Sequence, residues 1–384
     1  MTDVHGRAEP GFERVREAFA ANFSKGTEVG AAFCVYKDGR PVVDIWGGVA
    51  DEATGRPWEE DTTVLVFSTT KGATAVCANL LVQRGELDLD APVVEYWPEF
   101  GAHGKDKVPV RWLLSHRAGV AAVPRGLTVE DVVAWDPVID ALADAEPDWP
   151  PGARHGYHAL TYGWLVGEVV RRVSGETLGT FFRNEIAEPL GLDFWIGLPE
   201  AEEGRVAPLV VMPMIDFAWF PEHMRELLEA IAGPESLLMR SLGVGPFPPD
   251  LYNSRQVRAA EIPAANGVTT ARSLARMYAS LIGEVDGTRI LSDATVAQAR
   301  TTESEGPDAV LFVPMRFGLG FMLHGGFISM YQHGGFGHYG AGGSVGLAVP
   351  EAGLAIGYVM NRMDPGLTGD PRTQALFDAV RACV

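Results

Sequence analysis

Strand-like runs lie near both ends of the chain, and a long stretch with helical patterning separates them. Residues Gly30–Tyr36 and Pro41–Gly48 are apolar and β-branched, and the Asp38-Gly39 pair between them is typical of a hairpin turn. Strand-like runs broken by glycine return from Phe317 to Asn361, whereas Ser68 to about residue 200 is mostly helical in pattern. This order predicts one α/β unit that is built from both termini and carries a helical insertion.

We expect residues 1–80 and 265–384 to form the α/β domain and residues 81–264 to form a helical domain. The part of the helical domain at about 201–264 is rich in proline, methionine and aromatic residues, as in Met212-Pro213-Met214 and Phe217-Ala218-Trp219-Phe220-Pro221. Such a composition suits a loop with short helices that lines an apolar pocket, or an irregular interface between domains.

The charge balance excludes several kinds of partner. The 384 residues include 31 basic and 50 acidic ones, a formal net charge of −19, and no block of Lys or Arg offsets it. Nucleic acid and anionic membrane surfaces are therefore not expected as partners. The N-terminal residues lack the pattern of a secretory signal, and no segment offers about 18 unbroken apolar residues. We expect a cytoplasmic protein, and the sequence leaves its oligomeric state open.

Cysteine and histidine spacing predicts neither disulfides nor a metal centre. Cys34, Cys77 and Cys383 lie far apart in the chain. The nine histidines include no H-E-x-x-H motif, and His333 and His338 have no neighbouring carboxylate to complete a site. We therefore expect no cofactor.

The sequence Ser68-Thr69-Thr70-Lys71 lies where the strand-like run Thr63–Phe67 changes to a helical pattern that begins at Ser68. Residues three apart share a helix face, so the Lys71 amine can reach the Ser68 hydroxyl and remove its proton. The free N–H groups and partial positive charge at a helix start favour an oxyanion beside Ser68. Ser68 is therefore a candidate covalent nucleophile, and Lys71 is its candidate base.

An S-x-x-K pair also arises by chance, in which case Ser68 is an N-cap and Lys71 an exposed side chain. The residues that follow, Gly72 to Val82, carry almost no charge, so the helix is predicted to be buried. A lysine at the head of a buried helix is costly unless it is paired or its pKa is lowered. A lowered pKa is what a general base needs, which favours the catalytic interpretation.

A glycine-rich loop, Pro150 to Ala159, places Tyr157 shortly before a helix predicted to begin near Thr161 and to end at Gly175. A phenol can relay or accept a proton when nearby cations lower its pKa of about 10, and Lys71 is a candidate for such a cation. The alternative is a buried tyrosine whose hydroxyl bonds to the backbone.

Two further segments contain serine or histidine residues that we do not expect to react. Ser115 and His116 are sequence neighbours, so they do not face each other as a nucleophile and its base must, and His116 is expected to be a hydrogen-bonded interior residue. The G-x-S-x-G motif at Gly342–Gly346 suggests a nucleophile elbow, which needs a helix after the serine. Ser344 is followed instead by two apolar runs joined by a turn, which predicts a β-hairpin and a serine that is not the nucleophile.

The segment His338-Tyr339-Gly340 precedes this hairpin. At a strand edge its small residues let a substrate lie against the backbone, and the Ala341 N–H is a candidate second oxyanion donor beside Ser68. His338, Tyr339, Gly340 and Ala341 are thus candidate substrate-binding residues.

Taken in order, Ser68–Lys71, the Leu-Leu-Ser-His run at 113–116, Tyr157 and His338-x-Gly340 resemble the serine β-lactamase and penicillin-binding-protein superfamily in its class C-like branch. Within that branch the chain is most similar to the family VIII carboxylesterases, over nearly its whole length. The resemblance implies an α/β (α+β) fold of the β-lactamase/transpeptidase type, with an antiparallel sheet flanked by helices beside an all-helical domain. It also implies an acyl-enzyme at Ser68, a base role shared by Lys71 and Tyr157, and His338 in the place of the lysine of a Lys-Thr-Gly motif.

Two departures from the β-lactamase pattern concern the substrate. Ala159 stands where class C enzymes have the asparagine of Tyr-x-Asn, so an amide donor is missing. His338 is expected to be only partly charged near neutral pH, whereas a lysine there is a fixed cation suited to a carboxylate. Both changes favour neutral esters over β-lactams.

The leading hypothesis is a serine hydrolase that acts on small-molecule carboxylic esters. Alternatives on the same scaffold are a β-lactamase or D-amino-acid peptidase, and an acyltransferase in which an alcohol or amine replaces water. A non-catalytic binding protein is a further alternative, which the intact Ser68, Lys71 and Tyr157 argue against.

Overall fold

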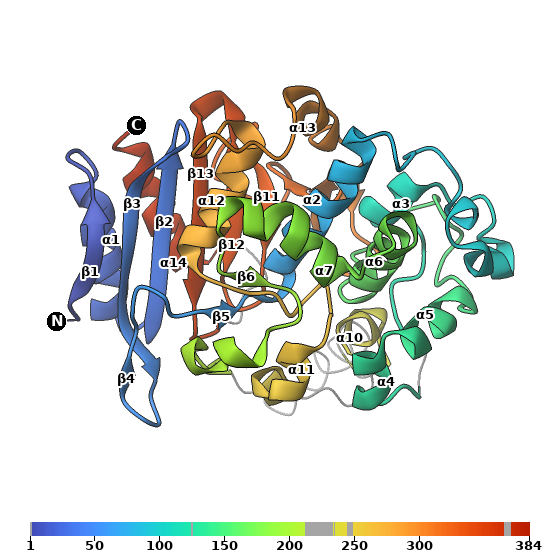
Figure 1. Cartoon of the computed structure of the whole chain (residues 1–384), viewed down its shortest axis with the longest axis horizontal. Helices are drawn as coiled ribbons and strands as arrows, with labels where there is room; N and C mark the ends of the chain where they lie inside the picture. The colour runs from blue at the N-terminus through green and yellow to red at the C-terminus, as the bar shows by residue number, and fades with distance from the viewer. Residues whose placement is uncertain (1, 124–125, 212–232, 234, 244–248, 365–369) are drawn as a thin grey trace, which may run out of the picture.

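The main feature of the computed structural model is a 10-stranded sheet (Figure 1). The structure describes residues 2–123, 126–211, 233, 235–243, 249–364 and 370–384. All its neighbouring strands pair antiparallel, in the order β1-β3-β2-β13-β12-β11-β10-β9-β8, with β4 paired to β3. The strand bounds are β1 Val4–Ala8, β2 Gly30–Lys37, β3 Arg40–Asp51, β4 Arg56–Pro57, β8 Ser304–Pro307, β9 Pro314–Phe317, β10 Met322–Leu323, β11 Phe336–Tyr339, β12 Val345–Val349 and β13 Leu354–Met360.

In the middle of the sheet, a strand from the N-terminal part of the chain pairs with one from the C-terminal part. Strand β2 pairs with β13 from Ala31 opposite Met360 to Lys37 opposite Leu354. The β2–β3 hairpin turns at Asp38 and Gly39, whose φ angles of 48° and 77° are those that a two-residue hairpin turn requires. A second, small sheet has the order β5-β7-β6, with β5 Val64–Leu65, β6 Phe194–Trp195 and β7 Val268–Thr269. The predicted sheet unit with strands from both termini is confirmed.

Helices cover both faces of the sheet. Helix α12 (Ala271–Ile282) packs on β13, β2 and β12, whereas α1 (Glu13–Ser24) and α14 (Pro371–Arg381) pack against each other. Alternate residues of β13 belong to two different core clusters: Ile356 shares one with α1 and α14, and Ala355 shares the other with α12. Because strand side chains alternate between faces, α12 covers one face and the α1–α14 pair covers the other.

The remaining helices gather beside the sheet around the buried helix α2 (Figure 1). Helix α6 ends at Gly175 in a left-handed conformation, as predicted from its C-cap glycine. The α-helix bounds are α2 Thr70–Gln83, α3 Val110–Leu114, α4 Val129–Ala134, α5 Asp136–Ala143, α6 Thr161–Ser174, α7 Leu178–Phe182, α8 Glu188–Leu190, α10 Leu237–Leu242, α11 Arg255–Ala259 and α13 Asp293–Ala299, with a π-helical turn at Arg183–Ala187. Short 3₁₀ helices are Phe67–Thr69, Val93–Glu95, Pro98–Gly104, Glu200–Arg205, Pro249–Asn253 and Pro350–Ala352.

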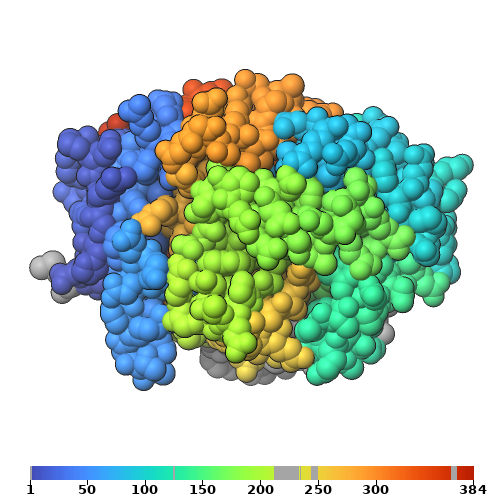
Figure 2. All heavy atoms as spheres, in the orientation of Figure 1, coloured from blue at the N-terminus to red at the C-terminus, as the bar shows by residue number. Residues whose placement is uncertain are grey.

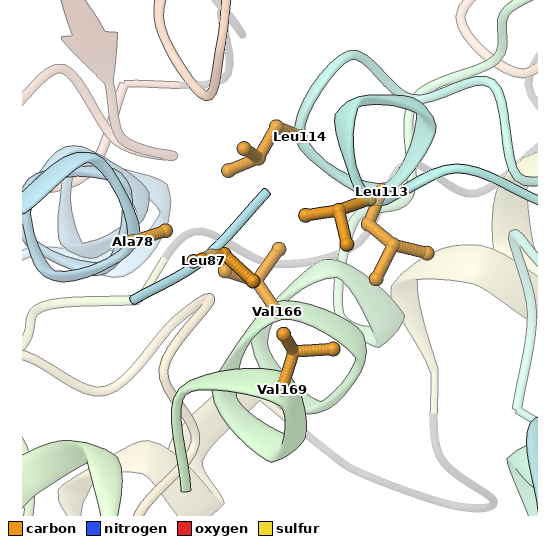
Figure 3. A pocket seen from close by; sticks show the side chains of 7 residues that line it. Ala78, Leu87, Leu113, Leu114, Val166 and Val169 are labelled. Carbon is orange, nitrogen blue, oxygen red and sulfur yellow. The ribbon is translucent and has the colours of Figure 1, made fainter. Parts of the chain in front are cut away.

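Tight apolar packing fixes α2 within this helical group. Seven side chains from α2, α3, α6 and the loop after α2 surround a gap too small for a water molecule (Figure 3). They are Ala78, Leu87, Val110, Leu113, Leu114, Val166 and Val169. The predicted burial of the helix that follows Lys71 is thereby confirmed.

The first strands of the chain and the segment of about residues 85–130 lie at opposite ends of the molecule. In Figure 2 the blue N-terminal strands occupy one end and the cyan residues of about 85–130 the other. The division into two domains stays a prediction, and Met212–Met214 and Phe217–Pro221 of the predicted apolar insertion lie outside the described residues. Among the helices described, none combines the length and apolar character needed to cross a bilayer.

Candidate active site

Ser68 lies in a tight turn between β5 and α2. The helix begins at Thr70 rather than at Ser68 as the sequence predicted, because Phe67–Thr69 form a 3₁₀ turn first. Phe67 has a φ of 44°, a left-handed conformation that is unfavourable for a bulky side chain and is often found at functional sites. Its ring packs edge-on against Tyr252 at 4.9 Å between centroids. The turn presents Ser68, which is partly exposed, ahead of a wholly buried helix.

Lys71 is fully buried one turn beyond Ser68. Its Nζ lies 3.0 Å from Ser68 Oγ, 2.7 Å from the Ala159 carbonyl and 3.0 Å from the Ala264 carbonyl. Burial lowers the pKa of the Lys71 amine well below its usual range. A neutral amine has two N–H groups and one lone pair, and the two carbonyls can only accept. When the amine is neutral, its two N–H groups can both go to these carbonyls, which leaves the lone pair for the Ser68 hydroxyl.

Tyr157 is placed by the loop before α6. Its backbone N–H donates to Asp308 Oδ1 at 3.0 Å, and the same oxygen accepts from the N–H groups of Val310 and Leu311. The sequence analysis did not predict this role for Asp308, which is buried. The signal that the sequence offers is weak: an aspartate in a loop, where its carboxylate can accept from nearby backbone N–H groups.

The phenol of Tyr157 is neutral and forms a hydrogen bond with Ser68. Burial raises its pKa, and a hydrogen bond with Ser68 opposes that rise. This differs from the expected lowering by a cation, because burial also lowers the pKa of Lys71, whose Nζ lies 4.8 Å from the Tyr157 ring centroid. The phenol thus keeps its proton at rest, and Ser68 lies within hydrogen-bond reach of both Tyr157 and Lys71.

Two buried histidines support the loop that carries Tyr157. As predicted, His116 is an interior residue: its Nδ1 accepts from the His158 N–H at 3.1 Å, and its ring lies 5.0 Å from that of Tyr157. His158 Nδ1 donates to the Gly156 carbonyl at 2.7 Å, and its Nε2 accepts from the Val120 N–H at 3.2 Å. These bonds join the loop after α3 to the loop before α6.

We expect acid to destabilise the protein through His158. Burial lowers its pKa from 6.5 to about 4. Between these two values the unfolded chain binds a proton that the folded protein does not, so the free energy of unfolding falls as the pH falls, by about 2–3 kcal/mol at pH 4.5. Denaturant titrations at pH 7 and pH 4.5 measure this fall in the free energy of unfolding. The fall should be about 2–3 kcal/mol smaller in His158→Gln than in the wild type. An exposed control, His5→Gln, should keep the wild-type loss, and an unchanged loss in His158→Gln would contradict this assignment.

The loop between β11 and β12 packs against the Ser68 turn. Ser344 is buried, and its Oγ donates to the Val66 carbonyl at 2.9 Å and lies 2.9 Å from Thr69 Oγ1. No helix follows it: β12 and β13 form the predicted hairpin. A Cβ at Gly340 would lie 2.1 Å from the Val66 carbonyl, so only glycine allows this approach. Ser344 therefore attaches the loop to the turn that contains Ser68.

Two backbone N–H groups are available for an oxyanion. Those of Ser68 and Ala341 donate to no group among the described residues. Arg372 binds the loop that contains Ala341: its Nη2 donates to the Gly342 carbonyl at 2.7 Å. The same guanidinium pairs with the buried carboxylate of Asp370. Sequence reasoning missed Arg372, since nothing in a helix near the C-terminus signals this contact.

His338 and Tyr339 point to opposite faces of β11. His338 is buried, its ring centroid lies 6.0 Å from that of Tyr157, and its Nδ1 lies 2.6 Å from the Tyr339 carbonyl. Burial, with a smaller effect of Lys71, lowers the pKa of His338 to about 3, so it is neutral rather than partly charged as expected. The Tyr339 hydroxyl donates to the Ser329 carbonyl at 2.5 Å and packs in the core shared with α1 and α14. The side chain of Tyr339 therefore packs in the core on the face of β11 opposite to His338.

Comparison with known proteins gives a consistent result. A family model described as Beta-lactamase matches residues 16–381. The esterase/beta-lactamase LipL of Mycobacterium tuberculosis is 41% identical over 366 residues, which span 94% of this chain and 83% of that protein. A crystal structure of a family VIII carboxylesterase matches with a TM-score of 0.88 and 39% identity over the full length of both chains. A penicillin-binding-protein homologue from Caulobacter crescentus matches with a TM-score of 0.86 and 37% identity, again over both full lengths.

Proposed function

Because the chain belongs to the beta-lactamase family, we propose that it is a serine hydrolase that cleaves carboxylic esters through a covalent acyl-enzyme at Ser68. It has the β-lactamase/transpeptidase-like fold, and the proteins to which it is similar include an esterase and a carboxylesterase. One observation carries the proposal. The Lys71 amine is held by two carbonyls with its Nζ 3.0 Å from Ser68 Oγ, within reach of the hydroxyl proton.

In the acylation step, Ser68 Oγ attacks the ester carbonyl carbon while its proton passes to Lys71 Nζ. The carbonyl oxygen becomes an oxyanion, which the N–H groups of Ser68 and Ala341 stabilise by hydrogen bonds. Collapse of this intermediate breaks the bond to the alcohol oxygen. The alcohol leaves with a proton from Tyr157, which recovers one from the protonated Lys71 through a water molecule.

In the deacylation step, water takes the place of the alcohol and follows the same route in reverse. Water gives a proton toward the Tyr157–Lys71 pair, its oxygen bonds to the acyl carbon, and the Ser68–acyl bond breaks with return of the proton to Ser68. An alcohol in place of water gives acyl transfer.

A β-lactamase or D-amino-acid peptidase on the same scaffold is the second candidate, since LipL is described as both esterase and β-lactamase. Ala159 offers no amide donor, and the neutral His338 offers no positive charge to a carboxylate. Both observations support esters as the better substrates. A cytoplasmic location and the absence of nucleic-acid partners stay predictions.

The test is a panel of p-nitrophenyl esters of graded chain length, assayed beside nitrocefin and a D-Ala-D-Ala peptide. We expect kcat/KM for the best ester to exceed that for nitrocefin by at least about 100-fold, a difference of roughly 3 kcal/mol in transition-state stabilisation. Comparable turnover of nitrocefin or the peptide would favour the second candidate. No turnover of any substrate would overturn the proposal.

A further inference from the structure

The hydrogen-bonding state of His338 follows from its contacts. The Tyr339 carbonyl can only accept a hydrogen bond, so the proton of the neutral ring lies on Nδ1, 2.6 Å from that oxygen. A neutral imidazole carries one N–H, so Nε2 has a bare lone pair. His338 therefore presents an acceptor, with no donor and no charge, at this position of the site.

This acceptor is buried and unused. His338 is 1% exposed, and its Nε2 has no hydrogen-bond partner among the described residues. Buried polar atoms in native proteins are almost always satisfied, and exceptions occur where a ligand binds. The hydroxyls of Tyr162 and Tyr278 are also unsatisfied, but His338 is distinguished by its place beside the reacting groups.

The position of the ring indicates which part of an ester it meets. His338 lies against Tyr157, which in the proposed function gives its proton to the departing alcohol. The carbonyl oxygen is directed to the Ala341 N–H, three residues along the chain. In the proposed mechanism, the contact with Tyr157 thus assigns the His338 ring to the alcohol side of the scissile bond.

We propose that His338 Nε2 accepts a hydrogen bond from a hydroxyl group on the alcohol portion of the ester. The preferred substrates are then esters of alcohols that carry a further free hydroxyl, such as diols and other polyols. A carboxylate at that place has only lone pairs to offer and is disfavoured by the bare Nε2. This inference rests on the proposed function and specifies its substrate class.

Three butyrate esters that differ only in the alcohol test the proposal: 2-hydroxyethyl, 2-methoxyethyl and carboxymethyl butyrate. In the wild type we expect kcat/KM for the hydroxyethyl ester to exceed that for the methoxyethyl ester by about 3- to 10-fold, the effect of one hydrogen bond. The carboxymethyl ester should be the poorest of the three. In His338→Phe, which keeps a ring but has no acceptor, the hydroxyethyl to methoxyethyl ratio should fall to near one. In His338→Lys, the carboxymethyl ester should gain relative to the other two.

The ratios separate the two hypotheses. A wild-type ratio of one or less, which needs no variant, overturns the role of His338, as does a ratio that His338→Phe leaves unchanged. Hydrolysis of p-nitrophenyl butyrate by the wild type would then still stand as evidence for the proposed function. Absence of that hydrolysis, or its survival in Ser68→Ala, overturns the proposed function instead.

Discussion

The Ser68→Ala variant is expected to lose at least about 10⁴-fold in kcat/KM for p-nitrophenyl esters, because no other group can form the acyl-enzyme. The fold should remain, since Ser68 is partly exposed and, within the described part of the chain, its hydroxyl bonds to Lys71 and Tyr157. Steady-state assays with protein matched to wild type by circular dichroism would measure the loss.

Ser344→Ala is the matched control for this experiment. It removes the only other serine in a hydrolase-like motif, and with it the bonds to the Val66 carbonyl and Thr69. We expect lower stability, by about 1–3 kcal/mol, and a measurable remainder of ester activity. Activity that survives in Ser68→Ala but vanishes in Ser344→Ala would reverse the assignment of the nucleophile.

Lys71→Met should lower kcat/KM by about 10²- to 10⁴-fold, the usual contribution of a general base. Methionine fills a similar volume but has no lone pair of suitable basicity to take the Ser68 proton. Because burial lowers the pKa of Lys71 well below its usual range, the wild-type amine stays neutral to lower pH than an exposed lysine. The ester kcat/KM of the wild type should therefore fall as the pH is lowered through that pKa, and the residual activity of Lys71→Met should lack this limb.

Lys105→Met controls for the removal of a buried lysine as such. Lys105 is also fully buried, with its Nζ bonded to the Ala145 carbonyl and 5.4 Å from the Phe100 ring centroid, but it has no contact with Ser68. The Lys105→Met variant should retain ester activity and differ from the wild type only in its free energy of unfolding. Equal losses of activity in Lys71→Met and Lys105→Met would contradict a base role for Lys71.

Features that depend on neighbouring residues in the sequence could be predicted: the β2–β3 hairpin, the end of α6 and the contact between Ser68 and Lys71. Asp38-Gly39 fixes its hairpin by turn chemistry, and Gly175 ends α6 because it adopts the left-handed conformation without strain. Ser68 and Lys71 are three residues apart, so their contact follows from helical geometry with little help from the rest of the fold.

The parts that the sequence did not predict depend on tertiary burial. The 3₁₀ turn at Phe67–Thr69 replaces the first helical turn because the left-handed Phe67 is held by packing, which no local propensity encodes. The protonation states of Tyr157 and His338 are set by desolvation, whose extent is known only after the chain has folded. Arg372 acts on the site from a helix distant in sequence.

The most direct test of the account is the identity of the residue that becomes covalently modified. Wild-type protein treated with a fluorophosphonate is predicted to gain one adduct by intact mass, located on Ser68 by peptide mapping. Modification should be much slower in Lys71→Met than in Lys105→Met. An adduct on Ser344 or on any other residue, or none at all, would contradict the claim that Ser68 is the nucleophile and Lys71 its base.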